Sequence, residues 1–366
     1  MRAVVRRNKQ LVCAEIADLT PGPGQVLART LCCGICGSDL HALHSFEHML
    51  ELGQRSGGGG VGGPSIDPAA DIVFGHEFCA EVLDHGPGSA KTLKAGTRVV
   101  TMPVMLTATG AETIGYSNRF PGGFAERMLL SEAMLLEVPN GLSALQAAMT
   151  EPFAVGEHAV AQSILGDPAG AGQAACLVIG CGPVGLAVIA ALKTRGVGPI
   201  VAADFSPARR ALAEVMGADE VIDPAKESPH AGWSARGVPT TFAERAMAQM
   251  SGTGKRAVIF ECVGVPGVLQ AIVEGAPGGA QIIVAGVCMA TDTLEPSLCI
   301  NKQLDFRFVL GYTPVEFAAT LRNIAEGRID VRAAITDTVG LDGVAGAFKA
   351  LADPERQCKI VVDPSL

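Results

Sequence analysis

The chain has 366 residues, which is long for one hydrophobic core, so we expect two domains. Its formal net charge of −9 argues against nucleic acid or an anionic membrane as a partner. Eleven scattered cysteines in a large apolar-rich chain favour reduced thiols and a cytoplasmic protein. The basic N-terminus is followed by Glu15 and Asp18 rather than by a long apolar core, so no secretory signal is expected.

Residues 1–31 are predicted to form β-strands, because short alternating runs are broken by the turn sequence Pro21-Gly22-Pro23-Gly24. The chain then enters a stretch rich in reactive side chains: Cys32-Cys33-Gly34-Ile35-Cys36-Gly37-Ser38-Asp39-Leu40-His41. Its Cys-x-x-Cys could be half of a zinc knuckle, but the chain has no second Cys-x-x-Cys to complete one. A redox pair is disfavoured because the motif lies in a β-rich region, far from a βαβ unit. Cys32 and Cys33 are best interpreted as buried structural thiols.

Residues 51–70 are glycine-rich and are predicted to form a mobile loop, since such a run cannot offset its ordering entropy. A strand-like run then leads to His76 and Glu77. With the upstream thiol of Cys36, this pair suggests a catalytic zinc site, which takes three protein ligands and keeps one position open. Spacing alone leaves open the alternative that His76 is an ordinary core or surface residue. Glu151 precedes a proline at a predicted helix start, where it is either a helix cap or a further ligand.

Residues 174–204 are predicted to form a βαβ unit that binds a dinucleotide. A strand-like run stops at Gly180-x-Gly182-x-x-Gly185, with Pro183 and Val184 opening the helix between the last two glycines. The glycines allow a tight turn, a close approach of pyrophosphate and close packing of helix on strand, while the helix N-terminus binds phosphate. Asp204 lies where a carboxylate should hold the ribose hydroxyl, and it would repel a 2′-phosphate, so NAD is expected rather than NADP. The same apolar run could be a membrane span, but its central glycines and proline disfavour that.

Arg209 follows Asp204 closely and is predicted either to stack on the adenine or to neutralise a 2′-phosphate. Beyond it, helices and strands alternate. Helices are predicted at 208–216, 241–250 and 266–274, and strands at 220–223, 257–262, 281–286 and 306–310. With the two strands of the βαβ unit, these give six parallel strands with right-handed crossovers. The tail is predicted to hold helices at 315–326 and 343–350 and strands at 334–339 and 358–362.

Six motifs in this order resemble the zinc-dependent medium-chain alcohol dehydrogenases. They are Gly34-Ile35-Cys36-Gly37-Ser38-Asp39-x-His41, Gly75-His76-Glu77, Gly122-Gly123-Phe124-Ala125-Glu126, Glu151-Pro152, Gly180-Cys181-Gly182-Pro183-Val184-Gly185 and Phe260-Glu261-Cys262-Val263-Gly264. The resemblance covers essentially the whole chain. It points to the polyol branch of sorbitol, butanediol and threonine dehydrogenases, because Glu151-Pro152 stands where liver alcohol dehydrogenases carry a cysteine ligand.

The resemblance implies an α/β fold of two domains: a GroES-like β-rich catalytic domain of residues 1–154 and 313–366, and a doubly wound, six-stranded Rossmann domain of residues 155–312. The cofactor would lie between them. It also implies one Zn²⁺ per chain, with Cys36 and His76 as firm ligands and Glu77 or Glu151 as the third ligand or as a holder of the zinc-bound water. A dimer or tetramer is implied, formed through edge strands at 281–286 and the segment 298–300.

For the reaction, the resemblance implies hydride transfer from a secondary alcohol, polyol or diol to NAD⁺, giving a ketone or aldehyde. Ser38 would accept the hydroxyl proton, His41 would pass it on through the ribose, and Asp39 would orient His76. One alternative is a zinc-free NADP-linked quinone or enoyl reductase, which would lack Cys36 and His76. Another is a non-catalytic binding relative, which should have lost its ligands first.

The chain departs from the family pattern in two places. It has no cysteine between Cys79 and Cys176, so the family's structural-zinc lobe must be missing or rebuilt. The interval from Cys36 to His76 is unusually long, and the excess coincides with the glycine-rich residues 53–64. This insertion is either a lid at the active-site entrance or a surface loop without a role.

Overall fold

The computed structural model describes residues 1–57, 66–108, 110–139, 141–167, 170 and 172–366. Residues 58–65 of the predicted glycine-rich loop therefore lie outside the described residues, and with them residues 58–64 of the proposed lid. Residues 51–55 were predicted to belong to that loop, but they complete helix α1 (Gly37–Arg55) instead. The prediction was wrong here because Glu51, Leu52, Gln54 and Arg55 are good helix formers, and the consecutive glycines begin only at residue 57.

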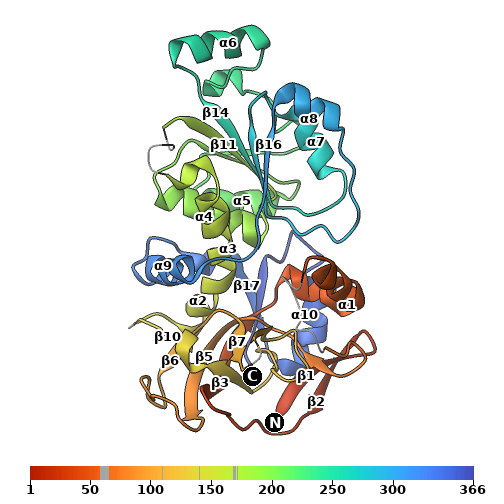
Figure 1. Cartoon of the computed structure of the whole chain (residues 1–366), viewed down its shortest axis with the longest axis vertical. Helices are drawn as coiled ribbons and strands as arrows, with labels where there is room; N and C mark the ends of the chain where they lie inside the picture. The colour runs from red at the N-terminus through yellow and green to blue at the C-terminus, as the bar shows by residue number, and fades with distance from the viewer. Residues whose placement is uncertain (58–65, 109, 140, 168–169, 171) are drawn as a thin grey trace. The chain divides into compact units, whose positions relative to one another are not determined.

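Contacts between residues within the chain group the protein into two compact units (Figure 1). The first contains residues 1–151, 317–327 and 335–366, and the second contains residues 152–316 and 328–334. The chain passes between the units four times: within the helices α3 (Thr150–Ala161) and α9 (Pro314–Ala325), after Gly327, and after Ala334. Each unit has its own sheets, described in turn below.

The first unit is built on β-sheets. Its largest sheet has the path β10 (Leu136–Glu137), β6 (Arg98–Val100), β5 (Glu77–His85), β3 (Gln25–Gly34), β18 (Lys359–Val362) and β17 (Ile335–Val339), with β9 (Arg127–Ser131) also paired to β3. A second sheet has the order β2 (Gln10–Glu15), β1 (Arg2–Arg7) and β4 (Ile72–Val73), and β7 (Val104–Thr107) pairs with β8 (Gly110–Thr113). Shorter elements complete the unit: α2 (Ala144–Ala148), α10 (Val344–Ala350), η1 (Glu132–Met134) and η6 (Leu341–Gly343).

Register in the large sheet decides which residues meet. Antiparallel pairing places Gly34 at the end of β3 opposite Glu77 at the start of β5. Gly34 also lies opposite Val361 of β18 on its other side. Residues just beyond Gly34, just before Glu77 and just before Val361 are therefore brought to one place, although they are far apart in the sequence.

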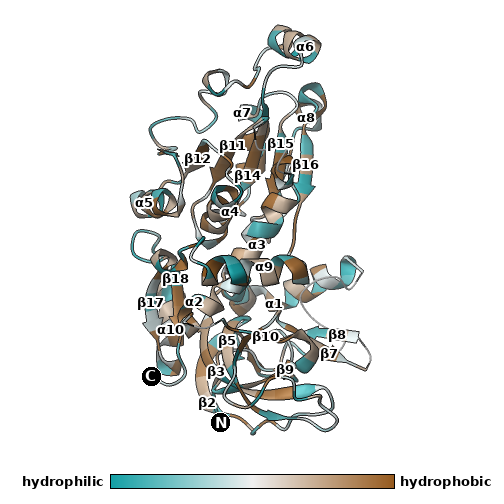
Figure 2. Cartoon of the chain, turned by 90° about the vertical axis from the view of Figure 1, so that its left-hand side faces the viewer, coloured by the Kyte–Doolittle hydropathy of each residue, from teal (hydrophilic) through white to brown (hydrophobic). Residues whose placement is uncertain are grey.

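The second unit contains a parallel sheet of six strands, as predicted. Its order is β13 (Glu220–Ile222), β12 (Ile200–Ala203), β11 (Ala174–Ile179), β14 (Arg256–Glu261), β15 (Gln281–Val284) and β16 (Asp305–Phe308). The central strands are almost entirely buried, and Figure 2 shows them as the most hydrophobic part of this unit. The remaining elements are α4 (Pro183–Thr194), α5 (Pro207–Met216), α6 (Phe242–Ser251), α7 (Val268–Gly275), α8 (Pro296–Lys302), η2 (Ile164–Gly166), η4 (Ser234–Arg236) and η5 (Val331–Ala334).

One detail of this unit differs from the prediction. The segment 281–286 was predicted to be an edge strand, but β15 pairs with both β14 and β16, so β16 is the edge. The apolar run considered as a membrane span is strand β11 followed by helix α4, as the predicted βαβ unit requires. Among the described residues, no helix is both long and apolar enough to cross a membrane.

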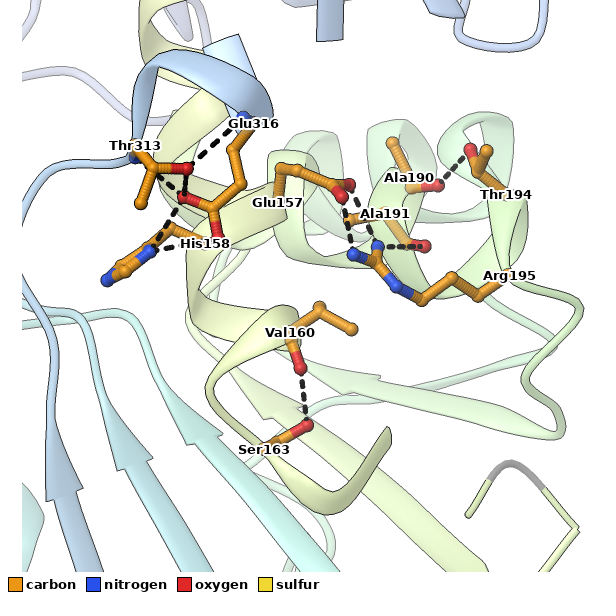
Figure 3. A network of polar contacts seen from close by, with 10 residues as sticks. All are labelled: Glu157, His158, Val160, Ser163, Ala190, Ala191, Thr194, Arg195, Thr313 and Glu316. Atoms are coloured by element: carbon orange, nitrogen blue, oxygen red, sulfur yellow. Dashed lines mark hydrogen bonds and ion pairs between the residues drawn. The ribbon is translucent and has the colours of Figure 1, made fainter. Parts of the chain in front are cut away.

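A polar network holds α3 to its neighbours within the second unit (Figure 3). His158 Nδ1 lies 2.9 Å and 3.2 Å from the two carboxylate oxygens of Glu316. Glu316 also accepts hydrogen bonds from the amide and hydroxyl of Thr313, while its own amide donates to that hydroxyl, so the pair forms a capping box at the start of α9. Further along α3, Glu157 forms an ion pair with Arg195 at the end of α4. The start of α9 and the end of α4 are thus both fastened to α3.

We predict that Glu316→Gln destabilises the protein only where the carboxylate would be ionised. Burial raises the pKa of Glu316, but the hydrogen bonds from Thr313 and His158 outweigh it, so its pKa lies below the ordinary value. A depressed carboxylate pKa stabilises the fold above the unfolded-state pKa, and this contribution is lost as pH falls through the folded-state value. Glu316→Gln should cost about 1 kcal/mol at pH 7, and the deficit should shrink below about pH 4.5.

Thermal unfolding midpoints measured across pH 3.5–8 would test this prediction. Glu214→Gln changes an exposed glutamate on α5 and serves as the matched control. A Glu316→Gln deficit of the same size at every pH would contradict the ionic contribution.

Candidate active site

Three metal-binding side chains converge in the first unit. One potential ligand atom each from Cys36, His76 and Glu77 lies within 4.8 Å of the other two. Cys36 is the N-cap of α1, and His76 directly precedes β5. The register that pairs Gly34 with Glu77 brings the two segments together. Gly75 makes the turn before His76 with φ +101°, where any added Cβ would meet Cys33 Sγ and Phe124.

Asp39 lies behind this cluster and is completely buried. Its Oδ2 accepts a hydrogen bond from the amide of Cys36 at 3.0 Å, which completes the helix cap. Its Oδ1 lies 3.4 Å from His76 Nδ1, an ion-pair distance without the alignment of a hydrogen bond. A carboxylate beside Nδ1 leaves Nε2 as the ring nitrogen for a metal, an arrangement common to metal-binding histidines.

Lys359 is a residue of this site that the sequence analysis missed. It is buried at the start of β18, and its Nζ lies 2.7 Å from both carboxylate oxygens of Glu77 and 2.9 Å from the carbonyl oxygen of Ile35. Burial lowers its pKa, but Glu77, Cys36 and Glu151 together raise the pKa above the ordinary lysine value. The available signal was a charged residue opening the apolar run 358–362, because lysine is almost never buried unless it is paired.

Tyr116 was also missed. Its hydroxyl oxygen lies 2.9 Å from Ser38 Oγ and 2.9 Å from Asp39 Oδ1. Its ring centroid is 5.2 Å from that of His76 and 5.7 Å from that of Phe74. Burial raises its pKa well above the ordinary tyrosine value. No local sequence pattern marks this residue, which lies in the segment between β8 and β9.

The remaining predicted residues take different positions. Ser38 lies next to the cluster, because its Oγ is hydrogen-bonded to the hydroxyl of Tyr116. His41 is an exposed residue on the next turn of α1. Glu151 is buried in the first turn of α3, close enough to Lys359 to raise its pKa, but it is not part of the compact group of three. The structure therefore gathers Cys36, Ser38, Asp39, His76 and Glu77 tightly and leaves His41 at the surface.

The charges of the site fit a divalent cation. Asp39, Glu77 and Glu151 are buried acids, and Cys36 adds a thiol. Among the described residues, Lys359 is the one buried lysine. Burial lowers the pKa of His76, but Asp39 and Cys36 outweigh it and raise that pKa well above the ordinary value. This means that the pocket carries an excess of negative charge. Sulfur, nitrogen and carboxylate oxygen are the donors from which catalytic zinc sites are built, so the residues fit zinc.

The dinucleotide fingerprint lies in the second unit at the carboxyl end of β11. Gly180 has φ +90°, and a Cβ at Gly185 would lie 1.8 Å from the carbonyl oxygen of Gly180, so both positions require glycine. At Gly182, the N-cap of α4, an added Cβ would meet nothing nearer than Arg209 Nη1 at 3.9 Å. That side of the helix N-terminus has room for a phosphate. Pro183 and Val184 form the first turn of α4.

Asp204 follows β12 and supports this loop. Its Oδ2 accepts a hydrogen bond from the amide of Cys181 at 2.7 Å, and its Oδ1 accepts one from the amide of Ser206 at 2.9 Å. The Nε of Arg209 is buried without a hydrogen-bond partner in the described part of the chain. The carboxylate, the free helix terminus and the guanidinium together match a site for the adenosine half of a dinucleotide.

Two family models match the chain. They are an alcohol dehydrogenase GroES-like domain over residues 22–140 and a zinc-binding dehydrogenase over residues 183–326. (R,R)-butanediol dehydrogenase of Bacillus subtilis (strain 168) is 32% identical, over 98% of each chain. Sorbitol dehydrogenase of the same strain is 25% identical, over 100% of this chain and 98% of the relative. The crystal structure of 2R,3R-butanediol dehydrogenase from Bacillus subtilis matches with a TM-score of 0.77 at 29% identity, over 99% of each chain.

The chain therefore belongs to the zinc-binding alcohol dehydrogenases. It is an alcohol or polyol dehydrogenase whose cofactors are zinc and NAD. This confirms the predicted family, fold class and kind of reaction. The zinc-free reductase and the non-catalytic relative are not better supported, because the chain retains the thiol, imidazole and carboxylate donors.

We predict that Lys359→Met destabilises the protein strongly. Removing the lysine leaves the carboxylate of Glu77 buried without its cation, which typically costs about 3–5 kcal/mol. Adding Glu77→Gln removes the unpaired charge and should recover a large part of that loss. The unfolding free energy from denaturant titration would measure both effects.

Lys349→Met removes an exposed lysine from α10 and should change stability by less than about 0.5 kcal/mol. If Lys359→Met were no more destabilising than Lys349→Met, the buried pair would not be a structural element of the site.

Proposed function

We propose that this enzyme oxidises one secondary hydroxyl of a small vicinal diol or polyol to a ketone, with NAD as hydride acceptor. The observation that carries the proposal is the buried group of Cys36, His76 and Glu77 with Ser38 beside it. Support for a vicinal diol comes from the relatives, whose names include (R,R)-butanediol and sorbitol dehydrogenases. The 32% identity over 98% of the chain favours a small diol over a long polyol.

The proposed division of labour follows from the positions of the side chains. Cys36 and His76 would hold the zinc, which when bound supplies the Lewis acidity that lowers the pKa of a substrate hydroxyl. Asp39 keeps the imidazole of His76 oriented from behind. Ser38 accepts the hydroxyl proton of the substrate, and His41, exposed on the same helix, passes a proton on to solvent.

For the third ligand, we propose Glu151. Both carboxylate oxygens of Glu77 already accept hydrogen bonds from Lys359. Glu77 is therefore better suited to contribute negative charge near the metal than to bind it. Glu151 is buried and acts electrostatically on the same lysine. With Lys359 positive, ionised Cys36, Asp39, Glu77 and Glu151 would leave three net negative charges, two of which a Zn²⁺ ion would balance.

For the cofactor, we propose that the loop of Gly180, Gly182 and Gly185 holds the pyrophosphate and that Asp204 holds the adenosine ribose. Arg209 would lie over the adenine side of this site. We also propose a cytoplasmic location, because eleven scattered cysteines in a large apolar-rich chain favour a reducing compartment.

We predict that the purified enzyme contains one zinc per chain and oxidises 2R,3R-butanediol with NAD faster than the 2S,3S isomer. Cys36→Ser should lose the zinc and the activity together. Ser38→Ala should keep the zinc but lower kcat by about 10²–10³-fold, because it removes only a proton acceptor. Glu151→Gln should weaken zinc binding more than Glu77→Gln does.

Metal analysis and initial-rate kinetics would check these outcomes, with Cys13→Ser on the exposed part of β2 as the matched control. Zinc retention by Cys36→Ser would refute the ligand assignment. Absence of NAD-linked oxidation of every vicinal diol would refute the substrate class.

We further propose that the enzyme is a homodimer joined through the edge strand β16. This strand pairs on one side only, and exposed apolar side chains surround it: Ile300 at 73%, Phe308 at 65% and Leu310 at 76%. An open apolar edge favours pairing with a second strand, and a second copy of β16 is self-complementary about a twofold axis.

We predict that Phe308→Glu reduces a dimer to a monomer, because it places like charges at the joined edges. Sedimentation velocity would measure the mass. Phe205→Glu changes an equally exposed phenylalanine away from β16 and should leave the dimer intact. A wild-type monomer, or a Phe308→Glu protein that remains dimeric, would contradict the proposed interface.

A further inference from the structure

The segment between β8 and β9 stands where the family's structural-zinc lobe was expected, and here it carries Tyr116 into the site. The backbone of Gly115, at φ +88°, packs so closely on Gly75 that an added Cβ would lie 2.9 Å from the carbonyl oxygen of Gly75. Gly75 directly precedes His76. The segment is therefore fitted against the turn that presents a proposed zinc ligand.

Two further sets of contacts fix Tyr116. Its ring packs in an aromatic group with Phe46 at 6.2 Å, Phe74 at 5.7 Å and His76 at 5.2 Å between centroids. After it, Ser117 Oγ donates to Glu112 and accepts from the amide of Arg119, and Glu112 also forms an ion pair with Arg119. A ring held on all these sides cannot easily redirect its hydroxyl.

The hydroxyl of Tyr116 stands between two groups with different hydrogen-bonding abilities. It lies at 2.9 Å from both Ser38 Oγ and Asp39 Oδ1, yet it has one hydrogen to donate. A carboxylate can only accept, so Tyr116 donates to Asp39 and receives the hydrogen of Ser38. With its hydrogen turned towards Tyr116, Ser38 presents lone pairs to anything else that approaches its oxygen.

We propose that Tyr116 is a positioning residue that holds the Ser38 hydroxyl ready to accept the proton of the substrate. This inference rests on the proposed role of Ser38. When the substrate O–H bond breaks, its proton forms a new O–H bond at Ser38, while the hydrogen that Ser38 had donated to Tyr116 turns away and leaves along the route through His41, so Ser38 ends with one O–H bond. Tyr116 gains and loses nothing; it restricts the rotation of the Ser38 hydroxyl before transfer. In this way the segment between β8 and β9 contributes to the catalytic site.

The test is a double-mutant cycle on the zinc-loaded enzyme with 2R,3R-butanediol and NAD. Tyr116→Phe keeps the ring and removes the hydroxyl, so kcat should fall about five- to tenfold, the range expected for one lost hydrogen bond, while KM changes less than about twofold. In a Ser38→Ala background the same change should alter kcat by less than about twofold, because the effect acts through Ser38. Zinc content should match that of the wild type, while the unfolding midpoint should fall modestly because the buried carboxylate of Asp39 loses a donor.

Tyr312→Phe is the matched control, since Tyr312 is the other tyrosine of the chain, and its kcat should stay within twofold of the wild-type value. An unchanged kcat in Tyr116→Phe would overturn the inference. So would a loss that persists undiminished in the Ser38→Ala background, or one accompanied by loss of zinc. The proposed function is judged separately, because it fails only if the wild type does not oxidise diols or if Ser38→Ala remains fully active.

Discussion

The register between β3 and β5 is the constraint on which the site depends. Because Gly34 faces Glu77, the N-cap thiol of α1 and the imidazole before β5 are placed together by backbone hydrogen bonds. A slip of one residue would turn every side chain of one strand to the opposite face. The pairing of β18 with β3 fixes Lys359 in the same way, since Val361 lies opposite Gly34. Backbone pairing in one sheet thus positions sulfur, nitrogen, carboxylate and ammonium groups before any metal binds.

The burial of charged side chains is the second feature that organises the site. Asp39, Glu77 and Glu151 are buried near Cys36, and burying a charge without compensation is costly. Lys359 offsets part of this charge through its two 2.7 Å contacts with Glu77. The remaining negative charge fits the proposed binding of a divalent cation. The same architecture couples stability to catalysis, because the residues that balance the charge also hold the metal-binding side chains in place.

The features that could be predicted from the sequence are those that depend on local patterns. The fingerprint from Gly180 to Gly185, the six parallel strands, and the Cys36 and His76 motifs all depend on short-range spacing, and the structure contains each of them. Tyr116 was not found because it reaches the site from a distant segment by aromatic packing, which leaves no local signature. Lys359 reaches the site by strand pairing, and its only local signal was a charge at the start of an apolar run. The edge of the parallel sheet was misplaced for a related reason: strand order depends on tertiary contacts, although β16 alternates charged and aromatic residues whereas β15 is almost wholly apolar.

The central claim is that zinc is held by one thiolate together with nitrogen and oxygen donors. X-ray absorption at the zinc edge, on enzyme purified without chelator, tests it most directly. The account predicts one sulfur at about 2.3 Å and two or three nitrogen or oxygen neighbours at about 2.0–2.2 Å, with the sulfur shell lost in Cys36→Ala protein reloaded with zinc. A shell of four sulfurs, or a sulfur shell that survives Cys36→Ala, would contradict it.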